Sequence, residues 1–261
     1  MKQRPAFPAK LDTAVRARTG AQGAPVAPSA SMARVPAVPQ PQGLGMDSTA
    51  VRMNMVQKLR GQGITDAAVL AAMGAIERHR FVDSGLVNQA YEDTSLPIGL
   101  GQTISKPGVV SRMAELMRNG ASGKIGRVLE IGTGCGYQAA VLSLLATEVY
   151  SIERLRGLHD KARDNLRHLR LPNVHLLFGD GMEGYAKGAP YAAIIAAAGG
   201  EAVPQAWVEQ LAVGGRLVAP VVTGTGKGSA QALLVLDKTP QGVRQTLLEP
   251  VHFVPLKSGV A

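Results

Sequence analysis

The sequence predicts an α/β protein with a doubly wound, seven-stranded, mostly parallel sheet and helical additions on its N-terminal side. Three observations predict this class. After Gly126, short apolar runs alternate with amphipathic stretches, which is typical of parallel strands joined by helices. The last two apolar runs have only a short link between them, so we expect an antiparallel hairpin at the end. The composition, 46% hydrophobic and 18% charged in 261 residues, is that of an ordinary globular protein.

Residues 1–46 differ in composition from the rest of the chain. Seven of the 16 prolines lie there among Ala, Gly, Gln and Ser, and no hydrophobic periodicity is visible. Such a segment buries too little apolar surface to offset the entropy lost on ordering, so we expect a disordered, Pro/Ala-rich N-terminal extension. It lacks the continuous apolar stretch of a secretory signal. No apolar run approaches the roughly 20 residues that span a bilayer, so we expect no membrane association.

Residues 47–257 are expected to form the folded domain. Its first part, 47–120, is expected to contain helices at 49–60 and 66–78, the second capped by Thr65 or Asp66, then a loop-rich stretch from Phe81 to Pro107 and a helix near 108–118. The sheet part, 121–257, carries seven apolar runs that we interpret as strands. These are Arg127–Ile131, Glu148–Glu153, Val174–Phe178, Tyr191–Ala197, Arg216–Val221, Gln231–Asp237 and Leu248–Val254, with helices near 137–146, 155–170 and 203–212 separating the first five.

The formal net charge of +9 raises the question of a nucleic-acid partner. The basic residues form no dense run, and four Phe, five Tyr and one Trp leave little to stack on bases. We interpret the charge as a mildly basic, solvated surface and expect no nucleic-acid partner. The single cysteine, Cys135, excludes an intrachain disulfide. The five histidines show no spacing with Cys or acids that would predict a metal site.

A glycine-rich turn after the first strand of the sheet is the strongest local motif. The stretch Glu130–Gly136 reads E-I-G-T-G-C-G, with Gly132, Thr133 and Gly134 at its centre, and it opens a helix. Glycines in such a turn let the backbone pass close to a ligand. The spacing is G-x-G-x-G and not the G-x-G-x-x-G of dinucleotide sites, and alone it fits a tight strand–helix connection equally well.

Two acids at the ends of the next strands strengthen the prediction of a ligand site. Glu153 ends the second strand, where a carboxylate in this fold meets ribose hydroxyls, and Asp180 ends the third, followed by Gly181. A surface acid or a turn-forming Asp-Gly would explain either one alone. Together with the turn they predict an adenosine-type ligand, and the turn has no phosphate-binding lysine, which favours S-adenosylmethionine over ATP. Seven strands ending in a hairpin fit the same class, the Rossmann-like fold of class I S-adenosylmethionine-dependent methyltransferases.

The loop-rich stretch before the sheet is more diagnostic. Residues 89–107 read Q-A-Y-E-D-T-S-L-P-I-G-L-G-Q-T-I-S-K-P and follow R-H-R-F-V at 78–82. With the glycine turn, the Gly-Asp-Gly at 179–181 and V-H-F-V-P-L at 251–256, they resemble the protein-L-isoaspartate O-methyltransferase family over about residues 50–257.

The resemblance implies a repair reaction on damaged peptides and proteins. A methyl group passes from S-adenosylmethionine to the α-carboxylate of an L-isoaspartyl residue, and the ester closes to a succinimide that reopens partly to normal aspartate. A carboxylate is already anionic at neutral pH, so the chemistry needs positioning and desolvation more than a strong base. The resemblance makes Ser105 the catalytic residue, with Thr103 and Ile104 beside it in the substrate loop. It assigns to cofactor binding Glu130, Gly132, Thr133, Gly134, Glu153, Asp180, Gly181 and Gln231.

Some positions leave two interpretations open. Ser105 could instead cap the helix that begins at Pro107. Asp93 and its neighbour Glu92 could brace the loop or contact substrate. The family's aromatic–Asp pair at the start of the fourth strand is Tyr191-Ala192 here, and its Thr-Ala-Ala becomes Ala196 to Gly200, which puts the polarity of the substrate pocket in doubt.

The resemblance also bears on the expected localisation and oligomeric state. An intracellular methyl donor and the absent signal predict a cytoplasmic enzyme, and without a dimerisation stripe a monomer is the default. Two alternatives stay open: a methyltransferase for RNA or a small molecule, and a non-catalytic cofactor-binding module of the same fold. Against the first, the sequence has no Asn/Asp-Pro-Pro-aromatic motif and no stacking platform. The altered fourth strand is the support for the second.

Overall fold

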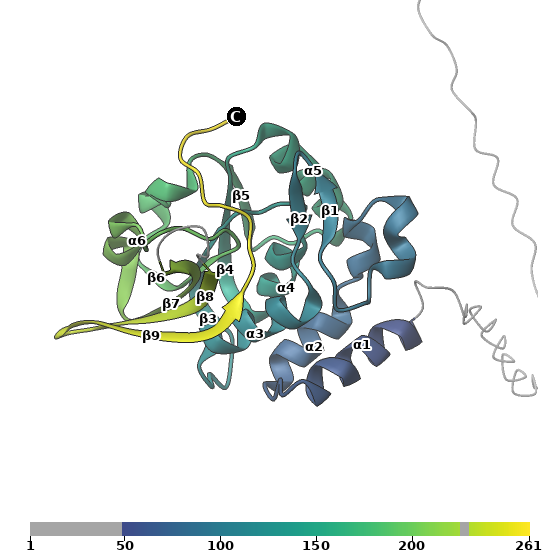
Figure 1. Ribbon diagram of the computed structural model, residues 1–261, viewed down its shortest axis with the longest axis horizontal. Helices are drawn as coiled ribbons and strands as arrows, with labels where there is room; N and C mark the ends of the chain where they lie inside the picture. Colours follow the sequence, from purple (N-terminus) through teal and green to yellow (C-terminus); the bar gives the residue numbers. More distant parts are fainter. Residues whose placement is uncertain (1–48, 225–229) are drawn as a thin grey trace, which may run out of the picture. The chain divides into compact units, whose positions relative to one another are not determined.

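The computed structural model describes residues 49–224 and 230–261, which belong to one compact unit (Figure 1). The expected disordered extension, 1–46, lies outside the described residues. At the centre of the unit is a seven-stranded sheet with the order β5-β4-β3-β6-β7-β8-β9. In chain order the strands are β3 (Ile125–Ile131), β4 (Ala146–Glu153), β5 (Val174–Phe178), β6 (Tyr191–Ala196), β7 (Leu211–Thr223), β8 (Ala230–Thr239) and β9 (Gly242–Val251).

The strand directions confirm the expected doubly wound sheet. Five strands, β5 to β7 in sheet order, pair in parallel, whereas β8 runs antiparallel to β7 and β9 antiparallel to β8. The terminal hairpin is therefore confirmed. From β3 the chain builds outward through β4 and β5 in one direction, and then returns to the other side of β3 with β6. Ligands of such sheets bind where the order reverses, at the carboxyl end of β3.

Helices cover both faces of the sheet. They are α1 (Thr49–Gly61), α2 (Ala67–Ala75), α3 (Pro107–Arg118), α4 (Tyr137–Leu145), α5 (Arg156–Leu166) and α6 (Gln205–Gln210). On one face Met113 of α3 and Leu142 of α4 pack with Val128 of β3. On the other face Trp207 of α6 packs with Leu129. Helices α1 and α2 share a further apolar cluster with α4, and Figure 1 shows them beside each other, outside α4.

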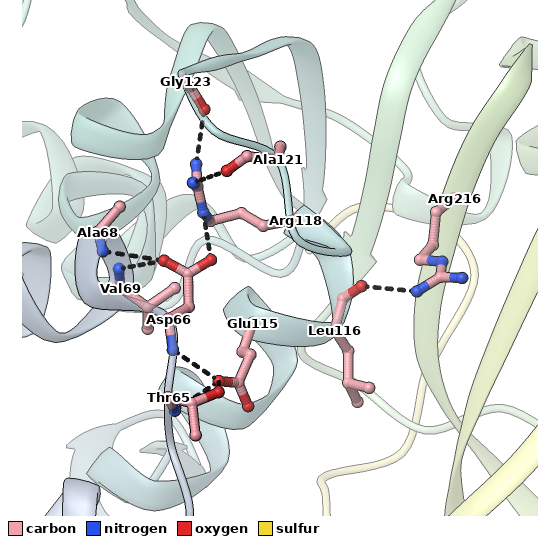
Figure 2. A network of polar contacts seen from close by, with 10 residues as sticks. All are labelled: Thr65, Asp66, Ala68, Val69, Glu115, Leu116, Arg118, Ala121, Gly123 and Arg216. Atoms are coloured by element: carbon pink, nitrogen blue, oxygen red, sulfur yellow. Dashed lines mark hydrogen bonds and ion pairs between the residues drawn. The ribbon is translucent and has the colours of Figure 1, made fainter.

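A polar network ties the start of α2 to α3 (Figure 2). Asp66 is the N-cap residue of α2, and its Oδ1 accepts hydrogen bonds from two first-turn amides. Its Oδ2 accepts from Nε of Arg118, at 2.7 Å. Glu115, one turn earlier on α3, accepts from the backbone amides of Thr65 and Asp66. Of the two capping residues expected, Asp66 is therefore the one that caps, and the network fixes α3 against α2.

Several boundaries differ from the expected ones. A two-stranded antiparallel hairpin, β1 (Leu96–Gly99) and β2 (Gln102–Ile104), occupies the stretch expected to be loop. The last strand, expected at Leu248–Val254, begins at Gly242 and ends at Val251. Its first six residues are exposed because β9 lies at the sheet edge, so they lack the apolar alternation that would reveal a strand. Helix α6 is shorter than expected because β7 begins directly at Leu211.

Candidate functional site

A cavity of about 270 Å³ lies at the carboxyl ends of β3 and β4, where the sheet order reverses. Four parts of the chain line it. They are the β1–β2 hairpin with the residues after it (Ile98, Leu100, Gln102 to Ser105), the turn and start of α4 (Ile131 to Cys135, Tyr137, Gln138), the end of β4 with the start of α5 (Ile152 to Leu155, Leu158), and a C-terminal stretch (Val254 to Lys257), with Val110, Gly181, Ala197 and Ala198. The cavity therefore combines both expected parts of the domain.

The glycine turn forms one wall of this first cavity. Gly132 and Gly134 have φ values of 89° and 57°, a left-handed conformation that glycine adopts without strain. A Cβ at Gly134 would lie 3.2 Å from the Ile98 side chain, so the turn also needs glycine to admit the β1–β2 hairpin. Thr133 between them lines the cavity. Burial raises the pKa of the Cys135 thiol to about 11, so this cysteine stays protonated and is not a nucleophile.

Glu153 is the acid that lines the first cavity. It is buried at the end of β4, and its two carboxylate oxygens accept hydrogen bonds from the amides of Gly134 and Leu155, each at 2.9 Å. These bonds fix the carboxylate while leaving lone pairs free, since each oxygen can accept twice. A carboxylate held in this way suits a pair of ribose hydroxyls.

Three residues expected to bind cofactor are not among those that line the cavity. Glu130 is fully buried, and its Oε2 bonds to Ser151 at 2.5 Å. Asp180 accepts from the amides of Met182 and Gly259, while its neighbour Gly181 does line the cavity. Glu130 therefore lies in the interior, whereas Asp180 is partly exposed and bonded to two amides.

Gln231 is the third of these residues, and it acts on the C-terminal segment. Its side chain accepts from the Phe253 amide at 2.7 Å and donates to the Phe253 carbonyl at 3.2 Å. This pairing holds the start of the segment Val254–Lys257, whose residues line the cavity. Gly199 packs directly against Gln231, and a Cβ there would lie 2.5 Å from Nε2.

The rest of the C-terminal segment closes over the same region. The backbone of Ala261 pairs with the chain after β4, donating to the Arg154 carbonyl at 2.8 Å and accepting from the Arg156 amide at 2.7 Å. The Arg154 side chain donates to the Gly259 carbonyl at 2.8 Å, and the Gly259 amide donates to Asp180. We call residues 254–261 the C-terminal strap. Sequence reasoning identified its first residues by resemblance and missed the rest, which carry no motif.

A second cavity, of about 700 Å³, adjoins the first. Four residues line both: Thr103, Ser105, Ala197 and Val254. Ser105 and Thr103 are therefore brought together in the wall between the cavities, while Ile104 lines only the first. Of the positions that depart from the family pattern, Ala197 lies in this wall and Ala198 lines the first cavity, whereas Ala192 lines neither.

The position of Ser105 depends on how α3 begins. Lys106, not Ser105, is the N-cap residue of α3, and the Lys106 side chain forms no capping hydrogen bond. The helix start is instead capped by Asp93, which lies earlier in the sequence and whose Oδ1 accepts a hydrogen bond from the Gly108 amide at 2.7 Å. A Cβ at Gly108 would lie 2.9 Å from that oxygen, so glycine permits the close approach. The capping interpretation of Ser105 is therefore wrong, and the structure favours the bracing role for Asp93.

Charged side chains line the second cavity in pairs. Lys106 lies 3.9 Å from Asp93, and Nε of Arg112 bonds to Glu249 of β9 at 2.8 Å. The hydrogen bond to Glu249 raises the pKa of Arg112, so this guanidinium is fixed as a cation. A cleft with paired charges and an apolar floor of Val251, Phe253 and Leu233 suits a polypeptide.

The described ranges, 49–224 and 230–261, show no cluster of three or more His, Cys, Asp or Glu that could hold a metal ion. Within the same ranges no helix has the length and apolar character needed to cross a bilayer.

Comparison with known proteins gives a consistent result. The model of the family described as protein-L-isoaspartate(D-aspartate) O-methyltransferase matches residues 50–261. The protein-L-isoaspartate O-methyltransferase of Methylibium petroleiphilum is 59% identical over 221 residues, covering 84% of this chain and 81% of that protein. Its counterpart from Leptothrix cholodnii is 57% identical over 221 residues, covering 84% and 77%.

Solved structures of the same family are similar to this chain. One of a protein-L-isoaspartate O-methyltransferase superposes with a TM-score of 0.72 at 28% identity, covering 80% of this chain and 67% of that one. A second, from Plasmodium falciparum in complex with S-adenosyl-L-homocysteine, has a TM-score of 0.67 at 22% identity and covers 79% and 98%. The second similarity bears on the fold alone.

Proposed function

The chain belongs to the protein-L-isoaspartate(D-aspartate) O-methyltransferase family, and on that premise we propose that its two adjoining cavities hold the two substrates. The enzyme transfers a methyl group from S-adenosylmethionine to the α-carboxylate of isoaspartyl residues in damaged proteins. In the proposal the first cavity takes the methyl donor and the second takes the polypeptide. One observation carries it: Ser105 and Thr103 line both cavities.

The residues of the first cavity fit the methyl donor. Glu153 offers fixed acceptors to the ribose, and Ile98, Leu100 and Leu158 supply apolar walls for a flat base. In this proposal Gly132, Thr133, Gly134 and Gly181 contact the donor, whereas Glu130, Asp180 and Gln231 support the lining residues without lining the cavity themselves. Residues 47–120 supply the substrate loop and 121–257 most of the cofactor site.

The bound donor supplies a methyl group activated by a positive sulfur. The isoaspartyl carboxylate, an anion at neutral pH, attacks that carbon, a C–O bond forms, and the C–S electron pair returns to sulfur. No proton needs to move in this step. The chain has to align the carboxylate, and we assign that role to the Ser105 hydroxyl as a hydrogen-bond donor. Thr103, Ala197 and Val254 complete the wall and limit water access to the carbon.

Methyl transfer to two peptides that differ in one residue, L-isoaspartyl or L-aspartyl, tests the function. Base-labile label from S-adenosylmethionine should appear on the isoaspartyl peptide alone. Equal labelling of both peptides, or label stable to base, would contradict the assignment.

Ser105→Ala tests the role of the shared wall. Loss of a hydrogen bond to a charged group costs roughly 1.5–3 kcal/mol, so kcat/KM for the isoaspartyl peptide should fall about 10- to 100-fold. The Kd of S-adenosylhomocysteine should stay unchanged, because Ser105 contacts the peptide carboxylate. Ser84→Ala, an exposed serine outside both cavities, is the matched control. Equal turnover by the Ser105 and Ser84 variants would remove Ser105 from the mechanism.

We further infer that the enzyme acts as a cytoplasmic monomer without a nucleic-acid partner. One chain lines both cavities, so the proposed site is complete without a second copy. Light scattering of the active enzyme tests the monomer.

A further inference from the structure

A chain of three side chains runs from the protein interior to the first cavity. Oε2 of Glu130 lies 2.5 Å from Oγ of Ser151, and that oxygen lies 2.7 Å from Oγ1 of Thr133. Glu130 and Ser151 are both completely buried, whereas Thr133 lines the cavity. The cavity surface is therefore connected by two hydrogen bonds to a carboxyl group that does not itself line the cavity.

The surroundings of the buried carboxyl group favour its neutral form. Burial, above all, and the negative charge of Glu153 raise the pKa of Glu130 to about 8, although the hydrogen bond from Ser151 opposes the rise. The surroundings explain this, because a carboxylate transferred from water to the interior without a cation is strongly disfavoured. Ser151 and Glu153 of β4 and Gln138 of α4 are the groups that act on it.

The protonation state of Glu130 decides which hydrogen-bond directions are possible in the chain. A protonated Glu130 can donate to Ser151, and Ser151 then donates to Thr133. The hydroxyl hydrogen of Thr133 is left to point into the cavity. An ionised Glu130 can only accept, so Ser151 would donate to it and Thr133 would donate to Ser151. Thr133 would then offer the cavity only lone pairs.

The glycine turn has few other donors to offer. The amides of Gly132 and Thr133 both donate to the Ile152 carbonyl, at 2.9 and 3.3 Å. The Gly134 amide donates to Glu153, and the Gly136 amide donates to the Thr133 carbonyl. These four amides are used within the protein, so the Thr133 hydroxyl and the Cys135 amide are the donors that the turn can direct at an anionic group.

We propose that Glu130 and Ser151 are positioning residues that make Thr133 a hydrogen-bond donor to the carboxylate of the methionyl part of the bound methyl donor. This inference rests on the first cavity as the cofactor site. The nearby N-terminus of α4 favours an anion at the same place. Neutral Glu130 then serves binding without touching the ligand.

We call the hydrogen-bonded series Glu130–Ser151–Thr133 the relay. Titration of S-adenosylhomocysteine into the full chain tests it, since that ligand keeps the carboxylate. Thr133→Val and Ser151→Ala should each raise its Kd about tenfold, and the double variant should be no weaker than either single one, because Ser151 acts through Thr133. Glu130→Gln should retain affinity, since the amide can donate to Ser151. Ser143→Ala is the matched control: Ser143 is also buried, but its hydroxyl donates within α4, to the Ala140 carbonyl.

5′-Methylthioadenosine, which lacks the amino-acid part, separates the relay from the site itself. Its Kd should be the same for the wild type, Thr133→Val and Ser151→Ala. If the wild type and both variants bind neither ligand, the assignment of the first cavity as the cofactor site is wrong. If both ligands weaken equally in the variants, or the two single effects multiply in the double variant, the relay is overturned.

The pH profile gives an independent test. As pH rises through about 8, Glu130 ionises and Thr133 loses its free hydrogen, so the wild-type Kd for S-adenosylhomocysteine should rise. In Glu130→Gln that rise should be absent, while the titration of the ligand's own amino group, common to both proteins, remains. The same profile in both proteins would overturn the proposal.

Discussion

At the scale of single residues, Asp66 has two stabilising roles. It caps α2 and pairs with Arg118, whose side chain is only 3% exposed (Figure 2). Removing one partner of a buried pair costs about 3–5 kcal/mol and losing an N-cap about 1 kcal/mol. We therefore expect Asp66→Ala to lower the free energy of unfolding by about 3 kcal/mol or more, measured by urea denaturation. Asp164→Ala, in the exposed pair with Arg167, should change it by less than about 1 kcal/mol.

The same carboxylate should make stability depend on pH. Burial acts to raise the pKa of Asp66, but the Arg118 hydrogen bond and two α2 amides outweigh it and lower the pKa below 3.8. A lowered folded-state pKa gives stability that is present above the unfolded value and lost as pH falls through the folded value. Wild-type stability should therefore fall below about pH 4, and less so in Asp66→Asn. Parallel decline of both proteins would contradict this origin.

At the scale of elements, the start of α3 is held by a residue from another segment. Asp93→Ala removes the acceptor for the Gly108 amide and should let Ser105, three residues before it, depart from its aligned position. We expect kcat/KM for the isoaspartyl peptide to fall about tenfold with the Kd of S-adenosylhomocysteine unchanged. Asp93→Asn should restore most activity, because its amide oxygen still accepts.

Glu92→Ala provides the control for Asp93. Glu92 is the adjacent acid, and it forms an exposed pair with Lys58 at 3.5 Å. Its loss should leave turnover unchanged. If Asp93→Ala lost only thermal stability and kept its kcat/KM, the bracing would be structural and not catalytic.

The elements that the sequence predicts well are those that bury a regular face. Helix α3 and strand β5 lie within a residue of their expected bounds, because their apolar spacing follows the helical and the extended period. The first half of β9 could not be found, since an exposed edge strand needs no apolar alternation. The β1–β2 hairpin was not predicted, because its strands of four and three residues are too short to show a hydrophobic period.

Those parts of the candidate site that lie within a short sequence motif at a strand end could be predicted. The turn around Gly134 and the acid Glu153 could be placed because strand ends in a parallel sheet share an edge. The bond between Asp180 and the Gly259 amide could not be predicted, because the two residues are 79 positions apart in the sequence. The relay from Glu130 likewise depends on Ser151, which lies on the neighbouring strand.

At the scale of the whole molecule, the C-terminal strap joins the end of the described chain to its middle. Its last residues bond to Arg154, Arg156 and Asp180 around the edge of the first cavity. Deleting residues 258–261 removes these bonds, so S-adenosylhomocysteine should dissociate several-fold faster in stopped-flow measurements. The circular dichroism spectrum should not change, because the deleted residues belong to no helix or strand. An unchanged dissociation rate would show that the strap does not cover the ligand.

The wall of four residues between the cavities has a consequence for the order of events in turnover. Each cavity is itself partly open to solvent, and the two meet only at Thr103, Ser105, Ala197 and Val254. In the proposed assignment each substrate would reach its own cavity without passing through the other. We therefore expect that either substrate can load first, and that spent donor can be exchanged for fresh donor while a damaged protein remains bound.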